Sequence, residues 1–293
     1  MGMDIKKLAD LYKRTFVSFI TLLIIGLLVW FSTNPVIAWV LVSSVCLLTA
    51  AAVWEYANLV KSKGFTFSSF LMIVVAVCLV ISFYLVQRGL DFPDLPVLVL
   101  ALGAGVFFIT HFRDSEDALV HIAVEFFGVC YVAIPISFML GILFQTGTLP
   151  LQDGRCWLFY LIAVTKVTDI GAYFVGRLWG KRRLAPNLSP RKTVEGALAG
   201  FVCAIITSLG LASLGTNTIG PTFNLTMYHA LLLGILMGIF GQIGDLSESL
   251  LKRDAAVKDS NKLPGFGGVL DMIDSLIFTA PIVYFFLKWH LET

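Results

Sequence analysis

The chain has 293 residues, 58% of them hydrophobic and only 14% charged, and its formal net charge at pH 7 is +2. Soluble domains carry about 25% charged residues, so the composition excludes an ordinary soluble protein and predicts a polytopic helical membrane protein. The net charge is uninformative by itself; the expected partners are small-molecule and lipid substrates and the bilayer, with no nucleic acid.

Nine apolar windows, each about long enough to cross the hydrocarbon core as a helix, follow one another along the chain. They fall near 15–33, 35–54, 68–87, 95–112, 119–144, 157–179, 194–214, 227–250 and 267–289. We therefore predict an all-α polytopic integral membrane protein with about nine transmembrane helices. They form one continuous membrane domain, with scaffold helices over 1–150 and a catalytic region over 151–293.

The positive residues are distributed unevenly between the two sides of the membrane. If the N-terminus is cytoplasmic, 17 of the 21 Lys and Arg residues fall in cytoplasmic segments and three fall outside. Membrane proteins keep Lys and Arg in their cytoplasmic loops. We therefore expect the N-terminus and both charged loops of the C-terminal half, 177–192 and 252–262, to face the cytoplasm, where nucleotides are.

The N-terminal half, 15–144, consists of apolar helices and short turns, with an aromatic-acidic edge at Trp54-Glu55-Tyr56. These helices are expected to supply scaffold, a dimer surface or a lipid cleft, so a homodimer is compatible with the sequence. Glu125 is an acid within a span, and both a structural and a functional role are open for it.

Four acids lie at the end of one apolar segment and the start of the last. Asp245 and Glu248 are three residues apart, and Asp271 and Asp274 repeat that spacing. A charged side chain at the bilayer centre costs about 2.5–3.5 kcal/mol, so a bound cation is an economical explanation. Carboxylate oxygens suit Mg²⁺, and we predict that these four acids hold it.

An alternative explanation is a solvated network in which the acids only pair with neighbouring cations. Those cations are Lys252, Arg253, Lys258 and Lys262. Because the acids lie inside apolar helical segments, the metal site is favoured.

A second polar cluster begins within the 157–179 span. Lys166 and Asp169 lie on one helix face and are expected to pair; an ion pair inside a membrane is a functional candidate, although a structural role is the alternative. Further along, Ser189 followed by Pro190 resembles a helix N-cap with proline at the first helical position.

That helix start would gather Lys192 and Thr193 around an anion site, although a stop-transfer cluster is the alternative. Gly265, Gly267 and Gly268 would let backbone approach a phosphate closely. Two phosphate-binding loops and a metal site suggest phosphoryl or nucleotidyl transfer to a membrane lipid. A phosphate monoester as nucleophile would need no general base, since it is mostly dianionic at pH 7.

At these residues the sequence resembles the phosphatidate cytidylyltransferase, or CDP-diacylglycerol synthase, family. Its signature is roughly Ser-x-hydrophobic-Lys-Arg-x4-Lys-Asp, a short spacer, then Pro-Gly-His-Gly-Gly-hydrophobic-x-Asp-Arg-hydrophobic-Asp. The positions that match in order are Ser249, Lys252, Arg253, Lys258, Asp259, Pro264, Gly265, Gly267, Gly268, Asp271 and Asp274. Phe266 and Met272 stand where the pattern has His and Arg, which puts nucleotide affinity or preference in question.

The resemblance implies that CTP and phosphatidate react, with Mg²⁺, to give CDP-diacylglycerol and pyrophosphate at the cytoplasmic face of a bacterial inner membrane. It implies catalytic roles for Lys252, Arg253, Lys258 and Asp259. It also implies substrate binding by Asp169, Ser189, Lys192, Thr193, Gly267 and Gly268. The metal would be held by Asp245, Asp271, Asp274 and Glu248.

Two other functions are compatible with a membrane body and a polar cluster. A CTP-dependent lipid kinase acting on dolichol or phytol would use a similar nucleotide site. A transporter would more typically have paired repeats and a site at mid-membrane, whereas here the acids gather in one half of the chain.

Overall fold

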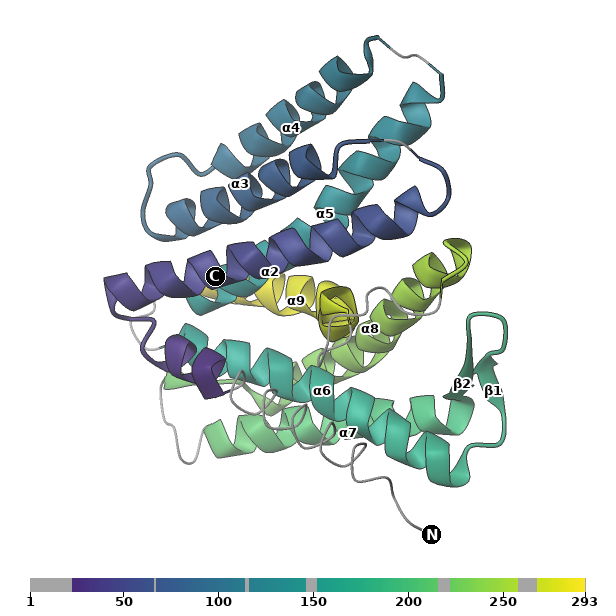
Figure 1. Cartoon of the computed structure of the whole chain (residues 1–293). Coiled ribbons are helices and arrows are strands. Elements are labelled where there is room, and N and C mark those ends of the chain that lie inside the picture. The colour runs from purple at the N-terminus through teal and green to yellow at the C-terminus, as the bar shows by residue number, and fades with distance from the viewer. Residues whose placement is uncertain are drawn as a thin grey trace, which may run out of the picture.

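The structure is a computed structural model that describes residues 23–65, 67–113, 116–145, 152–215, 222–257 and 268–292. Its helices and strands, drawn in Figure 1, are α2 (Pro35–Lys61), α3 (Ser69–Gln87), α4 (Leu95–His111), α5 (Ala118–Leu143), α6 (Gly154–Trp179), β1 (Arg183–Ala185), β2 (Ser189–Thr193), α7 (Val194–Leu214), α8 (Met227–Asp254) and α9 (Val269–Glu292). The described part of the first predicted window is helical over 23–30.

Seven of the described helices are long and apolar enough to cross a membrane, and α4, with 17 residues, is a shorter apolar helix. The prediction of an all-α polytopic membrane protein is therefore confirmed. Most predicted windows agree with the helices to within a few residues. The main difference is at α2, which continues seven residues beyond its window to Lys61. The apolar window ends before the polar residues Glu55 and Asn58, but the helix continues through them because this part of it packs against its neighbours.

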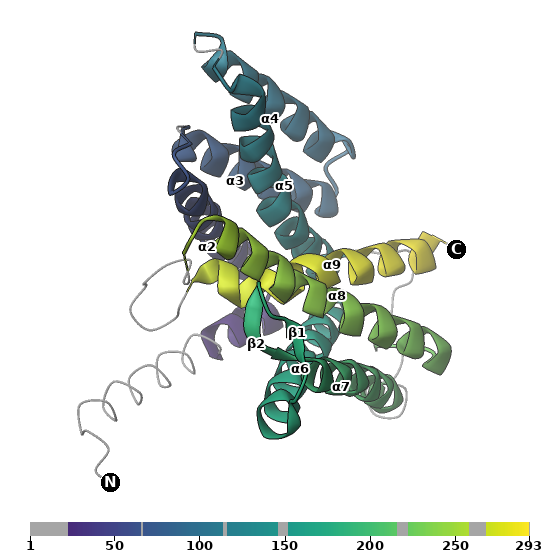
Figure 2. The same cartoon turned by 90° about the vertical axis from the view of Figure 1, so that its right-hand side faces the viewer.

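The helices form two packed groups. In the first, α3 and α5 contact each other and each contacts both α2 and α4, and in the second α6 packs on α7 and α7 on α8. Helix α9 contacts α8 in the second group and also α5 and α2 in the first; Figure 2 shows α8 and α9 side by side across the middle of the molecule. The predicted division at residue 150 stays a prediction, since α9 joins both groups.

Small residues bring α6 and α7 close together. A Cβ added to Gly200 would lie 2.8 Å from the Thr168 carbonyl oxygen, and one added to Gly196 would lie 2.9 Å from the Gly176 Cα. Small residues at a helix interface let backbones approach closely inside a membrane. This contact fixes α6, which carries Lys166 and Asp169, against the start of α7.

The segment between α6 and α7 is an antiparallel hairpin of β1 and β2, in which Ala185 pairs with Ser189 and Arg183 with Thr193. The predicted helix start at Ser189 is therefore wrong. Thr193 is the N-cap of α7, and its Oγ1 accepts from the Gly196 N–H at 3.2 Å. Glu195 stabilises this arrangement, because its carboxylate accepts the backbone N–H groups of residues 181 and 182 at the base of the hairpin.

Candidate active site

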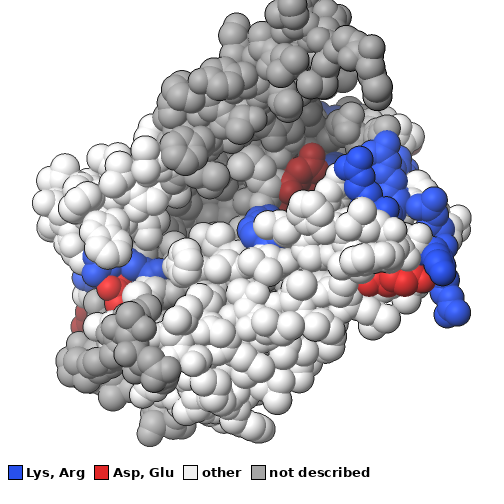
Figure 3. Space-filling view, turned by 90° about the horizontal axis from the view of Figure 1, so that it is seen from below, with Lys and Arg blue, Asp and Glu red and all other residues white. Residues whose placement is uncertain are grey.

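The predicted acids meet in one cavity of about 370 Å³ between α6, α8 and α9. The residues that line it are Lys166, Asp169, Asp245, Glu248, Ser249, Lys252, Arg253, Asp271, Asp274 and Ser275. Thus two pairs of acids more than 20 positions apart in the sequence share one space with basic side chains, as predicted. In Figure 3, basic side chains gather at the right of the face shown with acidic side chains beside them, a smaller charged group lies at the left, and most of the surface between the two is uncharged.

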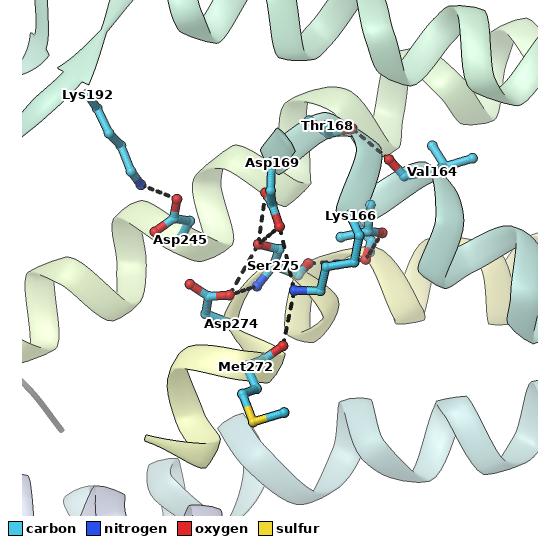
Figure 4. A network of polar contacts seen from close by, with 11 residues as sticks. Val164, Lys166, Thr168, Asp169, Lys192, Asp245, Met272, Asp274 and Ser275 are labelled. Carbon is cyan, nitrogen blue, oxygen red and sulfur yellow. Dashed lines mark hydrogen bonds and ion pairs between the residues drawn. The ribbon is translucent and has the colours of Figure 1, made fainter. Parts of the chain in front are cut away.

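Helix α6 contributes the predicted intramembrane ion pair. The Lys166 Nζ lies 3.5 Å from an Asp169 carboxylate oxygen and donates to the Met272 carbonyl at 3.1 Å. The Ser275 hydroxyl donates to Asp169 at 3.1 Å. Figure 4 shows these side chains pointing toward one another between α6 and α9. The pair therefore holds α6 against the first turns of α9.

Lys252 joins the acids of α8 to those of α9. Its ammonium lies 2.8 Å from a Glu248 carboxylate oxygen and also binds the Asp271 carboxylate. Lys252 is 9% exposed and Glu248 is 3% exposed. Glu248 and Lys252 therefore lie on one face of α8, as predicted, because they are four residues apart on the same helix.

Asp274 lies one turn after Asp271 and is 6% exposed. Its Oδ1 accepts the Ser275 N–H at 2.6 Å. Asp274, Asp245 and Asp169 line the same cavity, so three carboxylates share one space. Such a concentration of carboxylates in a partly buried cavity needs positive charge to balance it.

The hairpin between α6 and α7 packs against α8 through two more predicted cations, Lys192 of the hairpin and Arg253 of α8. The Lys192 Nζ lies 2.6 Å from Asp245, and the Arg253 guanidinium donates to the Leu188 carbonyl at 3.0 Å. Ser189 and Thr193 do not lie among the described residues that line the cavity. Thr193 instead caps α7 and is buried, so its predicted contact with substrate stays a prediction.

Part of the predicted site lies outside the described residues: Lys258, Asp259 and Gly267. Gly268 is described, and its N–H donates to the Asp271 carboxylate at 3.4 Å. Gly268 therefore lies next to the cavity, and its predicted contact with substrate stays a prediction.

Ser275 is not among the predicted site residues, although its hydroxyl donates to both Asp169 and Asp274. Its position directly after Asp274 in an apolar helix is a weak local signal. Only the approach of α6 makes it part of the site.

The acids fit Mg²⁺ as an open site. In the described ranges, no three His, Cys, Asp or Glu side chains are arranged to hold a metal by themselves. Mg²⁺ is usually held by one or two carboxylates, with water and substrate phosphates completing its octahedron, and not by a closed protein cage. Hard carboxylate oxygens on two adjoining helices, Asp245 on α8 and Asp271 on α9, suit that mode of binding.

Comparison with known proteins identifies the family. The sequence profile of the Cytidylyltransferase family matches residues 12–290. The chain belongs to this family. A cytidylyltransferase is a nucleotidyltransferase, so the predicted enzyme class is confirmed.

Three relatives of this cytidylyltransferase carry the name phosphatidate cytidylyltransferase. The protein of Chlamydia pneumoniae is 34% identical over 95% of this chain and 92% of its own length. That of Synechocystis sp. is 31% identical over 90% of this chain and 94% of its own length. That of Bacillus subtilis is 45% identical over 46% of this chain and 49% of its own length.

Helices α8 and α9 can approach closely at the cavity only because residue 244 is glycine. A Cβ at Gly244 would lie 3.1 Å from the Ser275 Cα and closer still to the Asp274 carbonyl oxygen. We expect Gly244→Ala to push the helices apart, to destabilise the protein by about 1–3 kcal/mol and to lower turnover by roughly 10²-fold, since misplacement by about 1 Å has such effects. Thermal unfolding in detergent and steady-state turnover measure the two effects.

The matched control is Gly210→Ala on α7, where an added Cβ would meet nothing within 4 Å. It should retain wild-type turnover and gain slightly in helix stability. Equal turnover of the Gly244→Ala and Gly210→Ala variants would contradict the close-approach argument.

Proposed function

We propose that this membrane enzyme is a phosphatidate cytidylyltransferase, which converts CTP and phosphatidate to CDP-diacylglycerol and pyrophosphate. The observation that carries the proposal is the single cavity in which acids and lysines of α6, α8 and α9 meet. It lies in a chain that aligns over 95% of its length with a relative of that name.

The reaction joins two phosphates, so the chain must position them and balance their charge. A phosphate oxygen of phosphatidate attacks the α-phosphorus of CTP, the bond from that phosphorus to the oxygen bridging to the β-phosphate breaks, and pyrophosphate leaves. Phosphatidate is a phosphate monoester and mostly dianionic at pH 7, so it needs no general base. The residues therefore act by orientation and by electrostatic stabilisation.

The cations of the cavity are placed for that role. Lys252 and Arg253 lie one after the other at the end of α8, and Lys192 reaches the same helix from the hairpin. Phosphate groups that enter the cavity would meet Lys252 and Arg253, which line it, and Lys192 lies beside it on Asp245. Lys258 and Asp259, outside the described residues, are proposed to complete the catalytic set.

We propose that Asp245 and Asp271 hold Mg²⁺, with Asp274 and Glu248 as further ligands or partners. When bound, the ion would neutralise charge on the phosphates and on the leaving pyrophosphate. Asp169 and Ser275 support this group from α6 and α9, because their hydrogen bonds fix the position of the Asp274 turn.

The membrane itself supplies one substrate. Seven long apolar helices place the chain in a bilayer, and the bias of Lys and Arg supports a cytoplasmic location for the hairpin and for the end of α8. Together with bacterial relatives, this supports a bacterial inner membrane with the active site facing cytoplasmic CTP.

The experiment that tests the function is incubation of the purified protein with phosphatidate, Mg²⁺ and CTP labelled at either the α- or the γ-phosphate. We expect α-label in the lipid, γ-label in pyrophosphate, and loss of both products when EDTA removes the metal. Lipid that carries the γ-label instead would show the kinase alternative. Uptake of a solute into vesicles, without release of pyrophosphate, would support the transporter alternative.

A further inference from the structure

A buried carboxylate from the N-terminal half binds the start of the helix that carries Asp271. Glu55 on α2 is 0% exposed. One of its oxygens accepts the Val269 N–H at 2.9 Å and the other accepts the Leu270 N–H, also at 2.9 Å. The two ends of this contact are more than 200 positions apart in the sequence.

The contact satisfies both partners. A carboxylate without hydrogen-bond partners is strongly disfavoured in a buried position, and two N–H donors at the positive end of a helix dipole provide charge-assisted bonds. In turn, the first N–H groups of a helix need acceptors from outside the helix. Gly268, the residue before α9, has no side chain that could cap it.

Helix α2 is a firm base for this carboxylate. The ring of Tyr56, the next residue, lies in the space beside Gly128 of α5. The Tyr56 hydroxyl donates to the Val124 carbonyl at 3.2 Å. Because α2 is tied to α5 in this way, Glu55 presents its oxygens to α9 from a fixed position.

Asp271 directly follows the two backbone groups that Glu55 binds. Its carboxylate contacts Lys252 of α8 and the Gly268 N–H. If the first turn of α9 opened, Asp271 would move away from the acids and cations of α8. The contact of Glu55 therefore decides where a proposed metal ligand lies.

We propose that Glu55 is a positioning residue for cytidylyl transfer: by capping α9 it fixes Asp271 at the cavity, so the scaffold half takes part in catalysis. This inference rests on the proposed function. Residues that orient metal ligands in this indirect way typically change activity or metal affinity by about 10- to 100-fold when replaced.

The test begins with hydrogen–deuterium exchange of the purified protein without substrates. In Glu55→Ala, the amides of residues 269 and 270 should exchange at least about tenfold faster than in wild type, while α6 amides stay unchanged. Glu55→Gln retains the size of the side chain and one carbonyl acceptor, so it should show a smaller increase; it also serves if the alanine variant does not fold.

Kinetics form the second readout. For Glu55→Gln we expect kcat to fall about 10- to 100-fold and the Mg²⁺ concentration for half-maximal turnover to rise by about tenfold. The KM for phosphatidate should change less than about threefold, because Glu55 does not line the cavity. A merely structural role would lower the yield of folded enzyme and leave these constants of the folded fraction unchanged.

The matched control is Glu125→Gln. Glu125 is another buried acid of the same half, 1% exposed and 3.2 Å from the His111 ring nitrogen. It should leave both exchange at residues 269–270 and the Mg²⁺ dependence at wild-type values.

The outcomes separate this inference from the proposed function. A wild-type enzyme that forms no CDP-diacylglycerol would refute the function, and exchange would still decide whether Glu55 holds α9. Unchanged exchange at residues 269–270 in the Glu55 variants, or faster exchange with normal kcat and Mg²⁺ dependence, would overturn the positioning role.

Discussion

Asp271→Asn is expected to lower turnover by about 10³-fold or more and to leave the protein folded. The asparagine retains the shape of the side chain but loses the negative charge that would hold Mg²⁺ and that pairs with Lys252. Loss of one electrostatic contact to the reacting phosphates has effects of about 10²–10³-fold, and loss of a metal ligand adds to it. The Asp271 side chain is 35% exposed, so water can solvate the replacement. CDP-diacylglycerol formation and thermal unfolding check the two parts.

Asp254→Asn is the matched control for this variant. Asp254 is the last residue of α8, its side chain is 61% exposed, and it pairs with Lys63 at 2.6 Å. An exposed pair of this kind contributes about 0–1 kcal/mol, so activity should stay near wild type. Wild-type rates for Asp271→Asn would refute its metal role.

Lys252→Met is expected to affect both stability and activity. It removes the ammonium between Glu248 and Asp271 and leaves Glu248 as an unpaired buried carboxylate. Removal of one partner of a buried ion pair typically destabilises a protein by about 3–5 kcal/mol. Turnover should also fall by at least about 10²-fold, because a cation that faces the substrate phosphates is lost. Thermal unfolding and turnover of the purified variant measure the two losses.

A second substitution separates the two effects. In Lys252→Met/Glu248→Gln the buried charge is gone, so most of the lost stability should return, since buried pairs are often replaced by neutral groups without loss. Activity should not return, because the cation is still missing and Glu248, a proposed partner of the metal, has lost its charge. If the double variant regained activity together with stability, Lys252 would have a structural role only.

Helices and site acids could be predicted because their signals are local. Apolar windows of about 20 residues define spans, and the i, i+3 spacing of Asp245 with Glu248 places both on one face. The Lys166–Asp169 pair follows from the same rule. These predictions required no knowledge of how the helices pack.

The hairpin at 183–193 could not be predicted in the same way. Ser189-Pro190 is compatible with a helix start and with an edge strand, and tertiary contacts decide between them. Glu195 binds the backbone at the base of the hairpin, while Lys192 and Arg253 hold it against α8. None of these contacts has a periodic pattern in the sequence.

The contribution of the N-terminal half was also hidden. In the sequence Glu55 stands out only as part of the aromatic-acidic edge at Trp54-Glu55-Tyr56, and nothing local indicates that it binds the start of α9. Glu125, for which two roles were open, lies away from the cavity and pairs with His111. A homodimer stays a prediction.

The central claim is that Asp245 on α8 and Asp271 on α9 act on the same metal ion. Binding of Mn²⁺, as a paramagnetic substitute for Mg²⁺, to the purified enzyme with CTP tests it most directly by electron paramagnetic resonance. We predict that wild type and Asp254→Asn bind the ion with equal affinity, and that Asp245→Asn and Asp271→Asn each weaken it by at least about tenfold. Undiminished Mn²⁺ binding in either of these two variants would contradict the claim.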